Sequence, residues 1–143
     1  MYKRSMESYR TDKKLVKKLG SIIKTITSII DAQEIILFGS FARGEQKKFS
    51  SIDILIIAKT DLPFIERIKK IIKALQPLNI PAEPLVFTPD EFRQKIENLD
   101  PFIISAIGEG ILIWSKGQKI DIKNQLRFKK VESEYKDLLW EVE

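Results

Sequence analysis

The turn that follows the first apolar run has the residues that a phosphate group needs. Gly39 and Ser40 come directly after "EIILF" (34–38), and Arg43 lies one helical turn later. Glycine allows a tight turn and a close approach of a ligand to the backbone, and free amides at a helix start favour an anion. The Ser40 hydroxyl and the Arg43 guanidinium could add a hydrogen bond and positive charge. The run is neither a P-loop nor a dinucleotide-binding fingerprint, because it lacks both of their glycine spacings.

Composition limits the chemistry further, because the chain has no histidine and no cysteine. A Ser-His-Asp triad, a cysteine nucleophile, a disulfide and a His/Cys zinc site are therefore excluded. A metal would have to be held by oxygen atoms, which favours a hard ion such as Mg²⁺. Proton transfer would fall to Asp, Glu, Lys or Tyr.

Apolar periodicity predicts the elements that must position this turn. Helical spacing predicts helices over 12–31, 62–76, 101–107 and 121–142, and one more that opens at "TPDEF", with Thr88, Pro89 and Glu91 as its N-cap, first-turn proline and capping-box acid. Apolar runs predict strands over 34–38, 52–58, 81–87 and 111–114. This order favours an α/β (α+β) fold with a short mixed sheet, as one domain over 1–143 with a core of about 33–115 and flanking helices.

The strand over 52–58 carries the acid that could do chemistry. Alternation places Asp53 and Leu55 on one face of the strand and Ile52, Ile54 and Ile56 on the other. An alternative is that Asp53 merely caps the edge of a buried strand. The two prolines of "PAEPLVF" predict that this later strand either lies at the edge of the sheet or starts its pairing late.

Charge and hydropathy give weaker indications of partners and compartment. The net charge is +5, and the first eighteen residues are rich in Lys and Arg. This favours an anionic partner, a nucleotide or a nucleic acid, although a solvated lysine face has the same composition. No apolar run is long enough to span a membrane and the start has no signal-peptide core, so we expect a cytoplasmic protein with no membrane partner. Frequent isoleucine, lysine and glutamate suit a thermophile or an AT-rich genome.

The spacing between the turn and the strand resembles a known family. From Ser40, ten residues lead to position 51 and two more lead to Asp53. A Gly-Ser pair, ten residues and a D-x-D position are the signature of the nucleotidyltransferase fold of the DNA polymerase beta superfamily. "GSFARG" and "SSIDILI" are similar to the "GSRARG" and "SDIDLLI" of its small prokaryotic and archaeal members, often called MNT proteins. The resemblance continues in "AEPLVFTPDEF" and "NLDPFIISAIGEGILIW", and so covers residues 33 to 115.

The resemblance implies that the Gly-Ser turn holds a nucleoside triphosphate, such as ATP, and that carboxylates hold Mg²⁺. Two acids would lie at positions 51 and 53, and a third on a neighbouring strand, where Glu83 is the only acid. Position 51 is a serine, so Asp53 and Glu83 are the expected metal ligands, with weak metal binding, and Ser51 could ligate only as a neutral oxygen. Glu83 precedes Pro84, and it could instead be a surface residue at a strand start. Lys47 and Lys48 could touch phosphates or be solvated loop charges.

Two interpretations stay open at this point. The chain could be an Mg²⁺-dependent enzyme that moves a nucleoside monophosphate from a nucleoside triphosphate to a hydroxyl of a protein or small molecule. Alternatively it could be a catalytically degenerate nucleotide-binding or partner-binding module, like the antitoxin half of a pair formed by an MNT protein and a helical HEPN protein. A third interpretation, that the chain binds nucleic acid, is supported only by its positive charge. The apolar stripes of the two end helices could close the core or form a homodimer.

Overall fold

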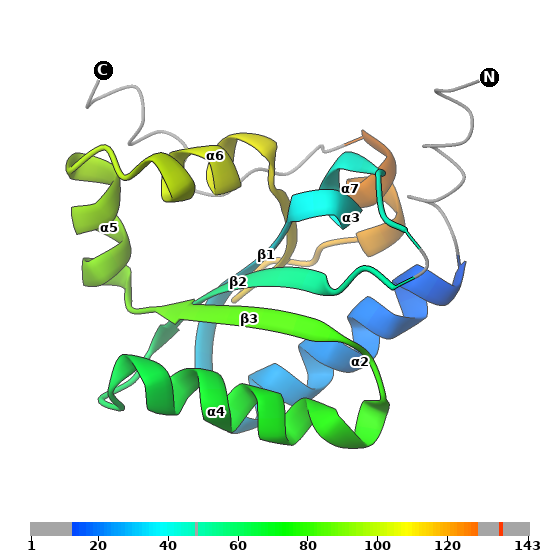
Figure 1. Ribbon diagram of the computed structural model, residues 1–143, viewed down its shortest axis with the longest axis horizontal. Coiled ribbons are helices and arrows are strands. Elements are labelled where there is room, and N and C mark those ends of the chain that lie inside the picture. The colour runs from blue at the N-terminus through cyan, green and yellow to red at the C-terminus, as the bar shows by residue number, and fades with distance from the viewer. Residues whose placement is uncertain (1–12, 48, 129–134, 136–143) are drawn as a thin grey trace.

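A four-stranded mixed sheet forms the centre of the molecule (Figure 1). A computed structural model describes residues 13–47, 49–128 and 135. The strands are β1 (Asp31–Phe38), β2 (Ile52–Lys59), β3 (Ala82–Phe87) and β4 (Ile111–Ser115), in the order β3-β2-β1-β4. β1 pairs antiparallel with β2 and β4, whereas β2 and β3 are parallel. The sheet confirms the mixed α/β class, and β3 lies at its edge, one of the two alternatives that its prolines predicted.

The helices follow the predicted order with shifted ends. They are α2 (Lys13–Ile29), α3 (Gly39–Arg43), α4 (Phe64–Leu75), the 3-10 turn η1 (Gln76–Leu78), α5 (Pro89–Glu97), α6 (Pro101–Glu109) and α7 (Ile122–Phe128). The last predicted helix, 121–142, is described as a helix only through Phe128, and the rest of that prediction lies outside the described residues apart from position 135. None of the helices that can be described is long and apolar enough to cross a bilayer.

The predicted start of the first strand was wrong by three residues. The sequence indicated a strand only from position 34, but β1 begins at Asp31, where it pairs with Lys59 of β2. Residues 31 to 33 contain a charged and an amide side chain at an exposed end of the sheet, and an apolar-run criterion misses such residues. A register shift between Ala32 and Glu34 interrupts the ladder there.

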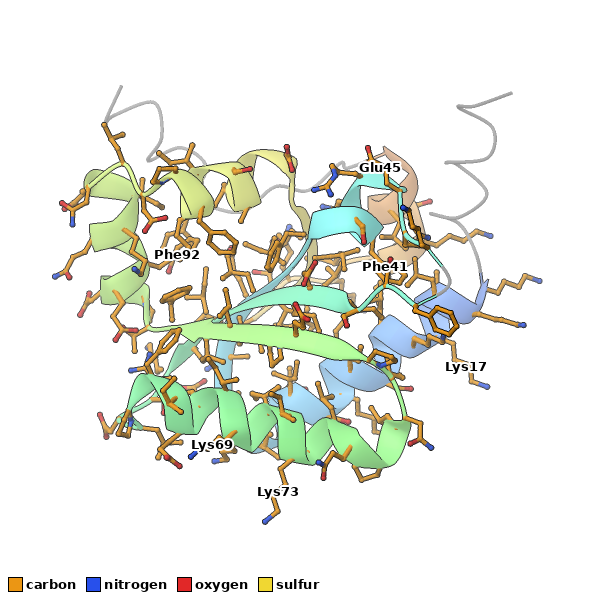
Figure 2. All side chains as sticks on the ribbon, in the orientation of Figure 1. Lys17, Phe41, Glu45, Lys69, Lys73 and Phe92 are labelled. Carbon is orange, nitrogen blue, oxygen red and sulfur yellow. The ribbon has the colours of Figure 1, made fainter. Side chains whose placement is uncertain are left out.

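Helices cover both faces of the sheet (Figure 1), and an apolar core lies on each face. The first packs α2, α4 and α7 against one face, through residues such as Leu19, Ile71 and Leu126. The second packs α5 and α6 against the other face, and Phe92 points from α5 toward the sheet (Figure 2). Lys69 and Lys73 point away from α4 into solvent (Figure 2). The molecule is therefore a helix–sheet–helix sandwich.

The side chains of β2 alternate between these two cores as predicted. Ile54 and Ile56 pack in the core with α2 and α4, whereas Leu55 and Ile57 pack in the core with α5 and α6. Period-two alternation therefore places Asp53 on the α5–α6 face of the sheet. The acid lies where this face reaches the end of the sheet that carries α3.

A hydrogen-bonded cluster holds α4, β3 and α5 together. Thr88 and Glu91 form the predicted capping box at the start of α5, with the Thr88 hydroxyl accepting from the Glu91 amide. The buried Arg67 guanidinium of α4 donates to both carboxylate oxygens of Glu91 and to the Val86 carbonyl of β3. Burial and two charged hydrogen bonds make this a strong contact, because a buried guanidinium must be fully paired. The cluster fixes the wall of the cleft described below.

Candidate functional site

The Gly-Ser turn has the backbone conformation that its glycines predict. Gly39 and Gly44 have φ values of 71° and 72°, in the left-handed region that disfavours side chains. Between them, residues 39–43 form the short helix α3, and the Gly44 amide donates to the Phe41 carbonyl at its end. Phe38 precedes the helix and supplies no side-chain cap. The first amides of α3 thus have no capping side chain, but a five-residue helix adds only a small dipole.

Gly39 lies directly against the predicted metal ligand. Phe38 is the register partner of Asp53 across β1 and β2. A Cβ atom placed on Gly39 would overlap the Asp53 Oδ2 atom and lie 3.0 Å from its Cγ atom. Only glycine therefore fits beside the Asp53 carboxylate, and the phosphate-type turn and the acid belong to one site.

The structure brings together the two predicted metal ligands, Asp53 and Glu83. They are register partners on the parallel strands β2 and β3 and so lie on the same face of the sheet. Burial, a hydrogen bond with the Glu83 carboxyl and repulsion from its charge raise the pKa of Asp53 to about 6, while the Arg43 charge acts in the opposite direction. The two carboxyl groups crowd each other, and a cation between them would relieve this repulsion.

Ser51 leaves the site with two carboxylates instead of three. It precedes the first residue of β2 and is half-buried. Within the described residues, no group of three or more His, Cys, Asp or Glu side chains could hold a metal ion. Mg²⁺ often uses one or two protein carboxylates and takes its other ligands from water and substrate phosphates. The Asp53–Glu83 donor set therefore fits Mg²⁺ bound together with a nucleotide, and fits a free metal ion poorly.

Arg43 lies beside this pair but is engaged with acids of its own. Its Nε donates to Glu45 at 3.1 Å, and its Nη1 lies 3.4 Å from Glu109 at the end of α6. Both partners and Arg43 are about half exposed, so these ion pairs are weak. A triphosphate could replace Glu45 and Glu109 as the partner of Arg43 at little cost. Phosphate binding by Gly39, Ser40 and Arg43 stays a prediction.

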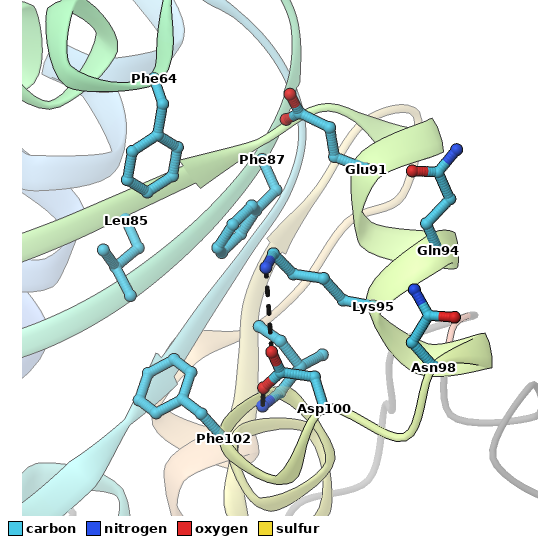
Figure 3. Close-up of a pocket in the computed structure, with 10 residues that line it drawn as sticks. Phe64, Leu85, Phe87, Glu91, Gln94, Lys95, Asn98, Asp100 and Phe102 are labelled. Atoms are coloured by element: carbon cyan, nitrogen blue, oxygen red, sulfur yellow. Dashed lines mark hydrogen bonds and ion pairs between the residues drawn. The ribbon is translucent and has the colours of Figure 1, made fainter.

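Two cavities lie near the Gly-Ser turn and along β3, and neither Asp53 nor Glu83 lines them. The smaller one, about 220 Å³, lies between the Gly-Ser turn and α6 and includes Gly39, Arg43 and Glu109. The larger one, about 590 Å³, lies between the face of β3 and helices α5 and α6 (Figure 3). Phe102 of α6 lines both.

The sequence did not reveal these two cavities. The sequence predicted that Phe102 lies in a short helix. In the structure Phe102 is 46% exposed and lies edge-on to Phe38, with 5.5 Å between the two ring centres. Of the two predicted loop lysines, Lys47 is exposed, and Lys48 lies outside the described residues.

The comparisons with known proteins concern the family and the fold. The family model of the nucleotidyltransferase domain matches residues 13–113. A putative protein adenylyltransferase of Methanocaldococcus jannaschii is 35% identical over 68 residues, which are 48% of this chain. The chain spans 63% of the length of that relative.

One solved structure supports the fold. A putative nucleotidyltransferase from Sulfolobus solfataricus aligns with a TM-score of 0.57 and 18% identity, over 82% of this chain and 93% of the other. That likeness supports the fold alone. A toxin–antitoxin structure with AMP-PNP aligns with a TM-score of 0.44 and 23% identity, over 80% of this chain and 82% of the other, which is too low for any inference.

Proposed function

Because the chain belongs to the nucleotidyltransferase domain family, we propose that it transfers a nucleoside monophosphate, preferentially adenylate, from a nucleoside triphosphate to a hydroxyl group of a protein. The observation that carries the proposal is the in-register pair of Asp53 and Glu83 beside the Gly39 turn. The adenylate preference and the protein acceptor follow from the relative named a putative protein adenylyltransferase.

Asp53 and Glu83 would hold Mg²⁺, and the Gly39–Ser40 turn and Arg43 would hold the phosphates. When bound, Mg²⁺ draws charge from the phosphate oxygens and so lowers the barrier to attack. The amides at the start of α3 and the Ser40 hydroxyl would orient the β- and γ-phosphates, while Arg43 exchanges Glu109 for phosphate oxygen. The close fit of Gly39 against Asp53 keeps the phosphates next to the acid pair.

The proposed transfer forms one bond to the α-phosphorus and breaks another. The acceptor oxygen forms a bond to the α-phosphorus, the bond between the α-phosphorus and its bridging oxygen breaks, and pyrophosphate leaves in line with the attacking oxygen. The hydroxyl proton passes to the Glu83 carboxylate, which is the more exposed of the pair. Position 51 supplies no third charge, so we expect slow turnover compared with a site that has three carboxylates.

The proposal is tested by label transfer. Wild-type protein, ATP labelled at the α-phosphorus and Mg²⁺ would be incubated with candidate partner proteins, in parallel with Asp53→Asn. We expect Mg²⁺-dependent labelling that Asp53→Asn abolishes. An enzymatic role is contradicted if wild type labels no partner with any of the nucleotides and divalent metals. It is also contradicted if Asp53→Asn labels the partners as strongly as wild type does.

A specific observation favours a second candidate, a degenerate module that binds a nucleotide and a partner without transfer. This observation is Ser51 together with the lack of any cluster of three potential metal ligands among the described residues. The partner would be a helical HEPN-type protein, as the resemblance to MNT proteins implies. The degenerate module predicts formation of a stable complex that Asp53→Asn leaves intact. Loss of the complex in this variant contradicts it.

A further inference from the structure

The larger cavity has walls that suit a flat aromatic ligand. Phe64 of α4, Leu85 and Phe87 of β3 and Phe102 of α6 surround it (Figure 3). The rings of Phe64 and Phe87 lie 5.4 Å apart, tilted by 38°, and Phe102 faces them across the opening. Aromatic and apolar walls of this kind accept the face of a nucleobase, because every base has a π-face that stacks well.

A donor and an acceptor, Lys95 and Asp100, lie side by side in this cavity, whose lining also includes Glu91, Gln94 and Asn98. Lys95 of α5 points into the cavity, with its Nζ atom 5.3 Å from the centre of the Phe87 ring and 3.8 Å from the Asp100 Oδ2 atom (Figure 3). The other oxygen of Asp100, Oδ1, accepts from the Ile103 amide as the N-cap of α6. Lys95 can therefore donate to a ring nitrogen or carbonyl, and Asp100 Oδ2 can accept from an adjacent N–H group. The edge of a nucleobase presents this combination.

The larger cavity lies on the face of β3 that also carries Glu83, and it shares Phe102 with the smaller cavity. Leu85 and Phe87 follow Glu83 at every second residue of β3, on the same face of the sheet. At about 3.3 Å per residue, the Leu85 wall begins roughly 7 Å from Glu83. Phe102 also lines the smaller cavity beside Gly39 and Arg43. One molecule can therefore occupy both cavities, with an anionic end at the turn and an aromatic end against Phe87.

We infer that the larger cavity binds the base of the nucleoside triphosphate, and that Phe102, Phe87 and the Lys95–Asp100 pair hold that base. This inference rests on the proposed function for the position of the phosphates. The area of the three aromatic walls favours a purine over a pyrimidine, because a purine stacks over more of them. An acceptor side chain is the other molecule that could enter here, and the experiment separates the two.

The test compares Mg²⁺-ATP with Mg²⁺ and inorganic triphosphate, which lacks the base, by calorimetry on the full chain. In wild type we expect ATP to bind at least about fivefold more tightly than triphosphate, since one stacked base contributes at least about that much. Phe102→Ala and Lys95→Met each lower ATP affinity by about tenfold. Lys95→Met leaves triphosphate affinity unchanged, and Phe102→Ala lowers it less than it lowers ATP affinity, because Phe102 also lines the smaller cavity. Phe102→Tyr keeps the ring and retains ATP affinity. Ile72→Ala, on the outer face of α4, is the control and changes neither affinity.

The outcomes separate this inference from the proposed function. The base site is overturned if wild type binds ATP and triphosphate with equal affinity or binds neither ligand. It is also overturned if Phe102→Ala and Lys95→Met each lower the affinities for both ligands equally. If ATP affinity is unaffected while the variants slow labelling of a protein acceptor, the cavity takes the acceptor and the inference is wrong. If the base-dependent difference is present but Asp53→Asn labels partners as well as wild type does, the base site holds and the proposed transfer fails.

Discussion

Ser51→Asp adds a third carboxylate to the proposed metal site, and its effect follows from the strand geometry. Residues two apart along an extended chain share a face and lie about 7 Å apart, so an ion between positions 51 and 53 is roughly 4 Å from each carboxylate. At an effective dielectric constant near 20, the added charge attracts a divalent ion by several kcal/mol, on the order of 4 kcal/mol per unit charge. If all of this 4 kcal/mol appeared in the binding free energy, the affinity for Mg²⁺-ATP would rise about a thousandfold.

Repulsion within the site reduces that gain. The pKa of Asp53 is already raised to about 6, and a third carboxylate would raise it further. We therefore expect a ten- to hundredfold gain in Mg²⁺-ATP affinity near pH 7.5, with a parallel gain in labelling rate. Calorimetry and label transfer measure both quantities.

A matched control is Ser50→Asp, which adds the same charge one residue earlier. Its carboxylate can still accept the Lys47 amide hydrogen bond that the Ser50 hydroxyl accepts at 2.8 Å. Equal affinities of the Ser51→Asp and Ser50→Asp proteins for Mg²⁺-ATP would refute the reasoning, because the effect would then come from net charge alone. A wild-type affinity as high as that of Ser51→Asp would show that the serine does not limit metal binding.

Three other changes probe the scaffold and the turn. Gly39→Ala forces a side chain into the left-handed region and against Asp53, so we expect a loss of at least about 1 kcal/mol in unfolding free energy and weaker Mg²⁺-ATP binding, measured by urea unfolding and calorimetry. Unchanged values for both would contradict the close fit. Thr88→Ala removes the N-cap of α5 and should cost about 1 kcal/mol in the same unfolding assay, whereas no loss would mean that the cap is dispensable. Hydrogen bonds from Arg67 lower the folded-state pKa of Glu91 below its usual 4.5, so the stabilisation from this pair is complete above that value and is lost as pH falls through the lower folded-state pKa. Glu91→Gln should therefore flatten the acid limb of stability against pH, and an unchanged limb would contradict the ion pair.

The sequence predicted the elements well because their signals are local. The apolar stripe of α2, the capping box at Thr88 and the alternation along β2 each lie within one segment, and local propensity and tertiary packing agree there. The turn at Gly39 was predictable for the same reason. The start of β1 was missed because its first residues are polar and gain their strand pairing from β2.

Contacts between segments were not available from one sequence. The position of Glu83 relative to Asp53 could not be predicted, because register is set by two strands and the crossover between them. The pairing of Arg43 with Glu109 joins residues that are 66 positions apart. The larger cavity depends on how α5 and α6 pack over β3, so neither its aromatic walls nor the Lys95–Asp100 pair could be assigned in advance.

The most direct test asks whether Asp53 and Glu83 hold one metal–nucleotide complex together. Mg²⁺-ATP affinity would be measured by calorimetry for wild type, Asp53→Asn, Glu83→Gln and the double variant. Each single change should lower affinity by tenfold or more, and the double variant should lose less than the sum of the single free-energy changes, since the two carboxylates share one ion. If Glu83→Gln binds Mg²⁺-ATP as tightly as wild type, or if the losses simply add, the two carboxylates do not form a joint site.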